Sequence, residues 1–169
     1  TNISYTELSI SFQVGRHRTR FCVSKYAEGT SERCSTTISS VAIHLARMSL
    51  VASILHMEFS HWIFCGFYVR IESTMLEIGP YSGNIIPCTH IPLGRGVCGT
   101  TMKEKRTIIV NNVNKYDNYI SCDSKTKSEI VTPIIKDDLV MAVLDIDSPN
   151  IGEFDKIDQI CLEKISSMI

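Results

Sequence analysis

Three cysteines lie in stretches without apolar periodicity, which makes their thiols candidates for chemistry. Cys88 follows a proline in a turn-like stretch, and Cys122 lies in a polar loop where nothing argues for burial. Cys98 begins an expected short helix, whose free backbone N–H groups stabilise a thiolate and lower the pKa of the thiol. A loop thiol among polar residues is a better redox candidate than one on an apolar face. Cys65, in an apolar strand, and Cys161, on the core face of the last helix, are therefore expected to be inert.

The spacing of the seven cysteines argues against a zinc site. Structural zinc sites use closely spaced pairs of cysteine or histidine ligands. This chain has no two cysteines separated by two residues, and His44 and His56 are twelve positions apart. The odd number of cysteines, without a hydrophobic secretory segment at the start, favours a reducing, cytoplasmic setting. We therefore expect no metal and interpret the cysteines as core residues or redox thiols.

Three carboxylates form the second group that could do chemistry. Asp145 and Asp147 are two residues apart in an expected strand, so their side chains leave the same face. Glu129 opens the neighbouring strand and is expected near that face. Three acids beside one pocket disfavour each other's ionisation, so at least one can keep its proton near neutral pH and serve as an acid. In the alternative, residues 145–149 simply end a strand in solvent, and spacing alone does not decide between the two.

Apolar periodicity predicts the elements that must position these groups. Apolar residues recur at three- and four-residue steps over residues 38–59, which predicts a helix that packs on a sheet. Its stripe comprises Ile38, Val41, Leu45, Met48, Ala52, Leu55 and Phe59, and its N-cap candidates are Thr36, Thr37 and Ser39. Residues 62–71 and 74–78 are rich in aromatic and β-branched side chains and predict a hairpin, after which Gly79-Pro80 punctuates the chain.

The second half of the chain predicts short elements around one long loop. These are a helix over residues 97–106, a strand over 107–110, a polar loop over 111–127 and a hairpin of strands 129–135 and 139–146. A closing helix over 154–168, capped by Asp155, carries Ile157, Cys161, Ile165 and Met168 on one face. Together the elements indicate an α+β fold, an antiparallel sheet with helices packed on one face.

Composition limits the class of protein. The chain has 169 residues, the size of one domain, and its 17 Lys+Arg against 18 Asp+Glu leave a net charge of −1. No basic stripe indicates a nucleic-acid partner, and no apolar run approaches the ~20 residues that span a bilayer, so no membrane partner is expected. Residues 1–37 form a separate N-terminal arm of uncertain structure. Their arginines, with no acid between Leu8 and Ala27, have some features of a transit peptide, but a basic surface arm is the simpler interpretation.

Five short segments carry a likeness to a known family: residues 79–83 (GPYSG), 91–99 (IPLGRGVCG), 122–123 (CD), 128–131 (SEIV) and 143–148 (VLDIDS). They closely resemble the free methionine-(R)-sulfoxide reductases, which are single GAF domains that reduce the R epimer of the free amino acid's sulfoxide. The resemblance runs from Phe64 to the end of the chain, and more loosely over residues 38–59. It implies a GAF-type antiparallel sheet over residues 38–169.

The resemblance also implies a role for each candidate thiol. Cys122 matches the family's nucleophile, Cys88 matches the resolving cysteine, and Cys98 matches a third cysteine that is an additional or alternative partner. One extra residue separates Gly83 from Cys88 relative to the family pattern.

The carboxylates and two aromatic residues match the family's pocket. Glu129, Asp145 and Asp147 correspond to its site carboxylates, and Tyr68 corresponds to a pocket aromatic. Phe64 stands where the family has tryptophan, and the tryptophan of this chain, Trp62, is shifted.

Two functions from different classes fit these residues. In the first, an enzyme, the Cys122 thiolate attacks the sulfoxide sulfur while Glu129 or Asp147 protonates its oxygen, and Asp145 holds the substrate ammonium. Cys88 or Cys98 then forms a disulfide with Cys122, which a thioredoxin-type dithiol reduces, with no metal or organic cofactor.

The second is a non-catalytic GAF sensor that binds a small ligand or senses oxidants through its thiols. A sensor needs no such set of cysteines and carboxylates. This chain has all three cysteines and all three carboxylates that match the family, which favours the enzyme. An N-terminal arm that targets or dimerises the protein is compatible with both functions, so a homodimer stays open.

Overall fold

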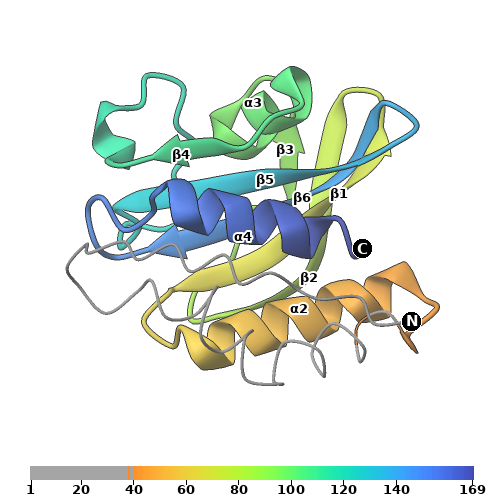
Figure 1. Cartoon of the computed structure of the whole chain (residues 1–169). Coiled ribbons are helices and arrows are strands. Elements are labelled where there is room, and N and C mark those ends of the chain that lie inside the picture. Colours follow the sequence, from red (N-terminus) through yellow and green to blue (C-terminus); the bar gives the residue numbers. More distant parts are fainter. Residues whose placement is uncertain (1–37, 39) are drawn as a thin grey trace, which may run out of the picture.

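The computed structural model describes residue 38 and residues 40–169. The expected N-terminal arm and the N-cap candidates Thr36, Thr37 and Ser39 lie outside the described residues. Figure 1 shows a twisted sheet flanked by helices. In chain order the elements are α2 (His44–Glu58), β1 (Phe64–Glu72), β2 (Met75–Gly83), β3 (His90–Pro92), α3 (Gly96–Glu104), β4 (Ile108–Val110), the 3-10 helix η2 (Val113–Lys115), β5 (Ser128–Lys136), β6 (Leu139–Ser148) and α4 (Lys156–Ser166).

Six strands form one antiparallel sheet in the order β3-β2-β1-β6-β5-β4. Both predicted hairpins, β1–β2 and β5–β6, are present, and the pairing of β1 with β6 joins them at the centre of the sheet. The turn of the second hairpin places Asp137 and Asp138 at φ values of 50° and 61°, a backbone region that aspartate tolerates better than most residues. The predicted α+β fold with an antiparallel sheet is confirmed.

Each face of the sheet buries its own hydrophobic core. The long helices α2 and α4 share one face, as expected, and their Leu55 and Leu162 pack there with Leu144 of β6. The short helix α3 lies over the opposite face, where its Met102 packs with Val143 of β6, so the expectation that the helices pack on one face is wrong for α3. Because successive side chains of β6 point to opposite faces, the same strand contributes to both cores. The second core, under α3, is the one that contains the candidate site.

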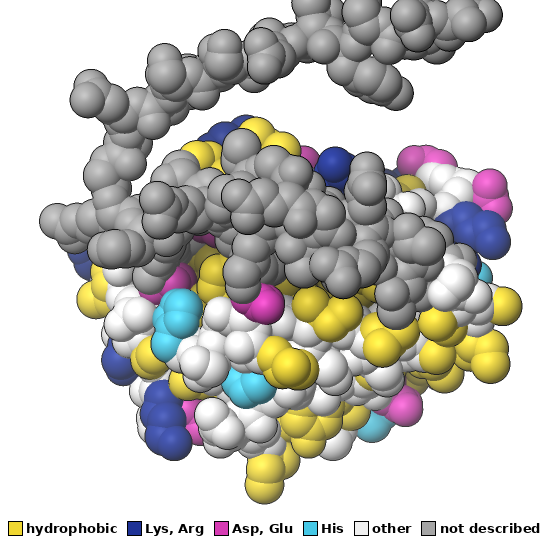
Figure 2. Space-filling view, turned by 60° about the horizontal axis from the view of Figure 1, so that its bottom comes forward, with side chains coloured by type: hydrophobic (Ala, Val, Ile, Leu, Met, Phe, Trp, Pro, Cys, Tyr) yellow, Lys and Arg dark blue, Asp and Glu magenta, His cyan; other side chains and the backbone are white. Residues whose placement is uncertain are grey.

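Helix α2 begins at His44, later than the predicted start at residue 38. Its N-cap residue, Ile43, has an extended backbone (φ −88°, ψ 117°), and the Arg47 side chain donates a hydrogen bond to the Val41 carbonyl just before it. Leu45 of the predicted apolar stripe is 55% exposed, whereas Met48, Val51, Ala52 and Leu55 are buried. Figure 2 shows the side of the molecule that carries α2, where hydrophobic side chains lie among polar ones. Periodicity therefore located the helix but extended its buried face too far.

Strand β2 continues through Gly79-Pro80, which the sequence suggested as punctuation. Gly66 pairs with Tyr81 and Tyr68 pairs with Ile78, so two residues of β2 lie opposite one residue of β1. This irregularity is a β-bulge, one of the places where a strand accepts a proline, since proline has no N–H to donate.

Helix α4 begins at the predicted cap. The Asp155 side chain accepts hydrogen bonds from the backbone N–H groups of Ile157 and Asp158, and the Asp158 side chain accepts one from the Asp155 N–H, which completes a capping box. Leu162 and Ile165 are buried, but Ile157 is 39% exposed, so the predicted apolar face is only partly correct.

None of the described helices is long and apolar enough to cross a membrane.

The beginning of α3 packs against β3 at very short range. A Cβ atom on Gly99 would lie 2.1 Å from the Pro92 carbonyl oxygen, so only glycine allows this approach. The Gly94 N–H donates to the Gly99 carbonyl (2.8 Å), and the Gly99 N–H donates to the Arg95 carbonyl (3.0 Å). This contact fixes the position of Cys98, the residue next to Gly99, over the sheet.

The variant Gly99→Ala tests that contact. The added methyl group has to displace the Pro92 carbonyl, so we expect the free energy of unfolding to fall by about 2 kcal/mol or more. Urea denaturation followed by circular dichroism measures the change. Lys103→Ala, an exposed position in the same helix, is the control and should change stability by less than about 0.5 kcal/mol. Equal stability of the two variants would contradict the close approach.

Candidate active site

The register of three neighbouring strands builds the floor of the site. Asp147 of β6 pairs with Glu129 of β5 on one side and with Phe64 of β1 on the other. Two residues earlier on β6, Asp145 pairs with Gly66 of β1. Residues directly opposite in an antiparallel pair have Cβ atoms roughly 4.5–5.5 Å apart, so the three carboxyl groups lie side by side on one face.

All of the sequence-predicted site residues except Cys88 line one small cavity over this floor. Its volume is about 20 Å³, enough for about one water molecule. The predicted site residues in its wall are Phe64, Tyr68, Cys98, Cys122, Glu129, Asp145 and Asp147. The exposed fractions of Glu129, Asp145 and Asp147 are 5%, 5% and 8%. The alternative that residues 145–149 merely end a strand in solvent is therefore wrong.

Burial dominates the ionisation of the three acids. It raises the pKa of Glu129 well above its usual value, and the charges of Asp145 and Asp147 raise it further. Burial and the charge of Asp145 likewise raise the pKa of Asp147 well above its usual value. The pKa of Asp145 rises to about 7, because hydrogen bonds with Cys98 and Glu129 partly offset its burial. Asp145 is thus the acid that ionises most readily.

Cys98 is the third residue of α3, but its environment opposes the effect of the helix N-terminus. Burial raises the pKa of the Cys98 thiol well above its usual value, and the charges of Asp145 and Glu129 raise it further. The expectation that α3 lowers this pKa is wrong, because the thiol lies within a group of buried acids. Its sulfur and one carboxylate oxygen each from Glu129 and Asp145 lie within 4.8 Å of one another. Among the described residues, this set has the donor types and spacing to hold a metal ion.

Two buried acceptors in the site have no hydrogen-bond donor within the described part of the chain. They are the Oδ1 atoms of Asp145 and Asp147, both of which belong to residues that line the cavity. Because buried polar atoms are nearly always paired, such atoms indicate a place for a donor or a cation from a ligand.

Aromatic side chains form one wall of the cavity. The ring of Phe64 lies 6.2 Å from that of Tyr68 and stacks on that of Tyr81 at 5.6 Å. A Cβ on Gly66 would lie 2.4 Å from the Tyr81 Cβ, so the missing side chain allows this packing. Trp62 belongs to the opposite core, where its ring stacks on Phe59 at 4.1 Å. Phe64, and not Trp62, therefore supplies the aromatic wall.

The long loop between β4 and β5 contributes residues that sequence reasoning missed. Tyr119 and Ile120 line the cavity beside Cys122. Asn118 connects the loop to the start of α3 by two hydrogen bonds. Its side-chain Nδ2 donates to the Gly94 carbonyl (2.6 Å), and its backbone carbonyl accepts from the Gly96 N–H (3.0 Å). The polar composition of this loop has no periodicity that could have indicated which residues turn inward.

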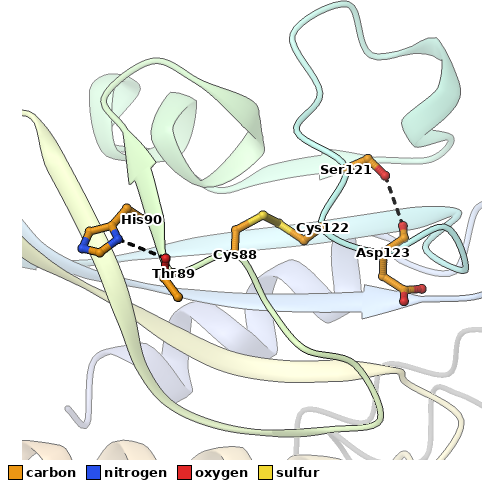
Figure 3. The surroundings of a disulfide bond; sticks show 6 residues. All are labelled: Cys88, Thr89, His90, Ser121, Cys122 and Asp123. Atoms are coloured by element: carbon orange, nitrogen blue, oxygen red, sulfur yellow. Dashed lines mark hydrogen bonds between the residues drawn. A yellow bond between two sulfur atoms is a disulfide. The ribbon is translucent and has the colours of Figure 1, made fainter.

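A disulfide bond joins Cys88 to Cys122, with Cα atoms 5.4 Å apart (Figure 3). It links the loop after β2 to the loop that carries Tyr119 and Ile120. Cys98 is free and buried, and so is Cys65, whose thiol pKa is raised by burial as expected for an inert core residue. Cys161 differs from expectation, because it is half-buried and disulfide-bonded rather than a free core thiol.

Comparison with known proteins identifies relatives of this arrangement. The family model described as GAF domain matches residues 48–169. The chain is 41% identical over 139 residues to the free methionine-R-sulfoxide reductase of Saccharomyces cerevisiae. The aligned region covers 80% of this chain and 72% of that protein. It is 34% identical to the free methionine-R-sulfoxide reductase of Escherichia coli, with 74% of each covered.

A solved structure of the free methionine-R-sulfoxide reductase from Neisseria meningitidis in complex with its substrate superimposes with a TM-score of 0.77. It is 31% identical and covers 81% of both chains.

Proposed function

Because the chain belongs to the GAF-domain family of free methionine-R-sulfoxide reductases, we propose that it reduces free methionine-(R)-sulfoxide to methionine. The observation that carries the proposal is that Cys122, disulfide-bonded to Cys88, lines the same cavity as three buried carboxyl groups. The disulfide supplies a route for two electrons, and the acids supply protons. A domain that only recognises a ligand requires neither.

The chemistry starts from the reduced pair Cys88 and Cys122. The Cys122 thiolate attacks the sulfur of the sulfoxide. The sulfoxide oxygen is transferred to the Cys122 sulfur as the sulfur–oxygen bond of the substrate breaks. Methionine leaves, and Cys122 is left as a sulfenic acid. The Cys88 thiol then attacks that sulfur, which releases water and forms the Cys88–Cys122 disulfide. A thioredoxin-type dithiol, the expected reductant of a cytoplasmic enzyme, restores both thiols and becomes a disulfide itself.

The carboxyl groups have two tasks in this scheme. A proton must reach the sulfoxide oxygen as its bond to sulfur breaks, and Glu129 or Asp147, paired across β5 and β6, donates it. Asp145 holds the substrate ammonium, for which its unpaired Oδ1 is a suitable acceptor. The rings of Phe64 and Tyr68 form the wall against the substrate's methylthio end, and the buried setting favours a free amino acid over a residue within a peptide.

The separated epimers of the substrate test this function. With thioredoxin, thioredoxin reductase and NADPH, the purified protein should consume NADPH with free methionine-(R)-sulfoxide. Little activity is expected with the S epimer or with an N-acetylated, C-amidated substrate, because acetylation removes the ammonium group that Asp145 holds in this scheme. Equal rates with the two epimers would contradict the assignment.

Single-turnover methionine formation tests the cysteines. Cys122→Ser should abolish it, since no sulfenic acid can form, whereas Cys88→Ser should still release about one methionine per enzyme molecule and then recycle slowly. The matched control is Cys65→Ala, a free buried thiol in the opposite core, which should lower stability by about 1 kcal/mol and keep turnover. If Cys122→Ser formed methionine like the unaltered protein, the nucleophile would be another thiol, with Cys98 the first to examine.

The isosteric variants Glu129→Gln and Asp147→Asn test the proton donor. An amide keeps the shape and a hydrogen-bond donor but cannot give up the proton, so at least one variant should lower the single-turnover rate by about 10²–10⁴-fold. Asp145→Asn should act mainly on the apparent substrate affinity. Rates measured against substrate concentration separate these effects. Near-normal rates of both Glu129→Gln and Asp147→Asn at saturating substrate would exclude these acids as donors.

A further inference from the structure

Three metal-binding side chains converge on the cavity from three different elements. Cys98 comes from α3, Glu129 from β5 and Asp145 from β6, and all three are buried. One donor atom from each lies within 4.8 Å of the other two. A tetrahedral zinc ion with Zn–S near 2.3 Å and Zn–O near 2.1 Å holds its ligand atoms roughly 3.5 Å apart. Side-chain adjustments of about an ångström therefore suffice to place all three on one ion.

A separate observation indicates that a cation fits here. Asp147 is not one of the three, yet it lines the same cavity, is 8% exposed and has no donor to its Oδ1 within the described residues. This oxygen can supply a fourth ligand or bind a water on the ion.

The chemistry of the donors selects the class of metal. One sulfur with two or three carboxylate oxygens suits a borderline-soft divalent ion such as Zn²⁺, whereas Mg²⁺ and Ca²⁺ prefer oxygen alone. A divalent ion also offsets the mutual repulsion of several buried carboxylates, which is the least favourable feature of this part of the protein.

We propose that Cys98, Glu129 and Asp145 bind one Zn²⁺ ion, and that the bound ion keeps the sulfoxide substrate out of the cavity. The metal site itself is independent of the proposed function, and only the competition with substrate rests on it. In this scheme Zn²⁺ is an inhibitor, because it occupies the acids that the reaction needs free.

Cobalt titration tests the site without any turnover. Co²⁺ replaces Zn²⁺ in such sites, and a thiolate bound to it gives a charge-transfer absorption band in the near ultraviolet. The protein with its Cys88–Cys122 disulfide intact is used, so that neither of those sulfurs can bind. One equivalent of Co²⁺ should produce the band in the unaltered protein and in Cys65→Ala, whereas Cys98→Ala should show none. Glu129→Gln should weaken Co²⁺ binding by at least about tenfold.

A band that persists in Cys98→Ala, or one that vanishes equally in Cys65→Ala, would overturn the site. Should Cys98→Ala fail to fold, crystals of the unaltered protein soaked in Zn²⁺ decide the matter. An anomalous difference peak between Cys98 and Asp145 is expected, and a peak elsewhere or no peak would refute the proposal.

Competition separates this inference from the proposed function. Free methionine-(R)-sulfoxide should raise the apparent dissociation constant of Co²⁺ for Cys122→Ser, which cannot reduce the sulfoxide, and Zn²⁺ should raise the KM of the unaltered enzyme for the sulfoxide without lowering kcat. If the Cys98-dependent band forms but no sulfoxide is reduced, the function fails and the metal site stands. If the sulfoxide is reduced and the band never forms, the metal site fails alone.

Discussion

Three carboxyl groups are buried next to one another on a single face of the sheet, and the position of β6 between β1 and β5 holds them there. Burial opposes the ionisation of each acid, and each charge opposes the next. Burying three carboxyl groups together lowers the stability of the folded protein, so packing elsewhere must offset that cost. That packing comes from the two hydrophobic cores, whose side chains alternate with the acids along the same strand. Leu144 and Ile146 of β6 anchor one face, while Asp145 and Asp147 occupy the other.

Polar contacts at the ends of these strands keep the register. Ser128 and Ser148 form the pair next to Glu129 and Asp147. The Ser128 hydroxyl donates to the Asn150 carbonyl (2.7 Å) and accepts from the Glu153 N–H (3.3 Å). The buried Glu153 carboxylate in turn accepts hydrogen bonds from the side chains of Asn150 and Trp62. Trp62 lies in the opposite core, whereas the pairing of Phe64 with Asp147 places Phe64 in the wall of the cavity.

Local patterns were sufficient for most of the elements, though not for the start of α2 or the length of β2, and for the faces of the acids. The two-residue period placed Asp145 and Asp147 together, and the capping residues of α4 were readable from Asp155 onward. Patterns failed wherever distant segments decide the outcome. The pKa of Cys98 depends on acids that are 31 and 47 positions away in the chain. The same distances explain why the spacing of cysteines and histidines did not single out Cys98, Glu129 and Asp145, which meet only in the folded sheet.

The Cys88–Cys122 bond closes a loop with a sequence separation of 34 residues. In the chain-entropy description, a cross-link of that length restricts the unfolded ensemble enough to stabilise the native state by about 3–4 kcal/mol. Within the proposed cycle this link forms and breaks once per turnover, so the enzyme passes between a cross-linked form and a more easily unfolded one. When the thioredoxin-type reductant is limiting, the enzyme accumulates in the disulfide-bonded form. Oxidising conditions, which generate the sulfoxide substrate, thus also favour the form of the protein that is more stable against unfolding.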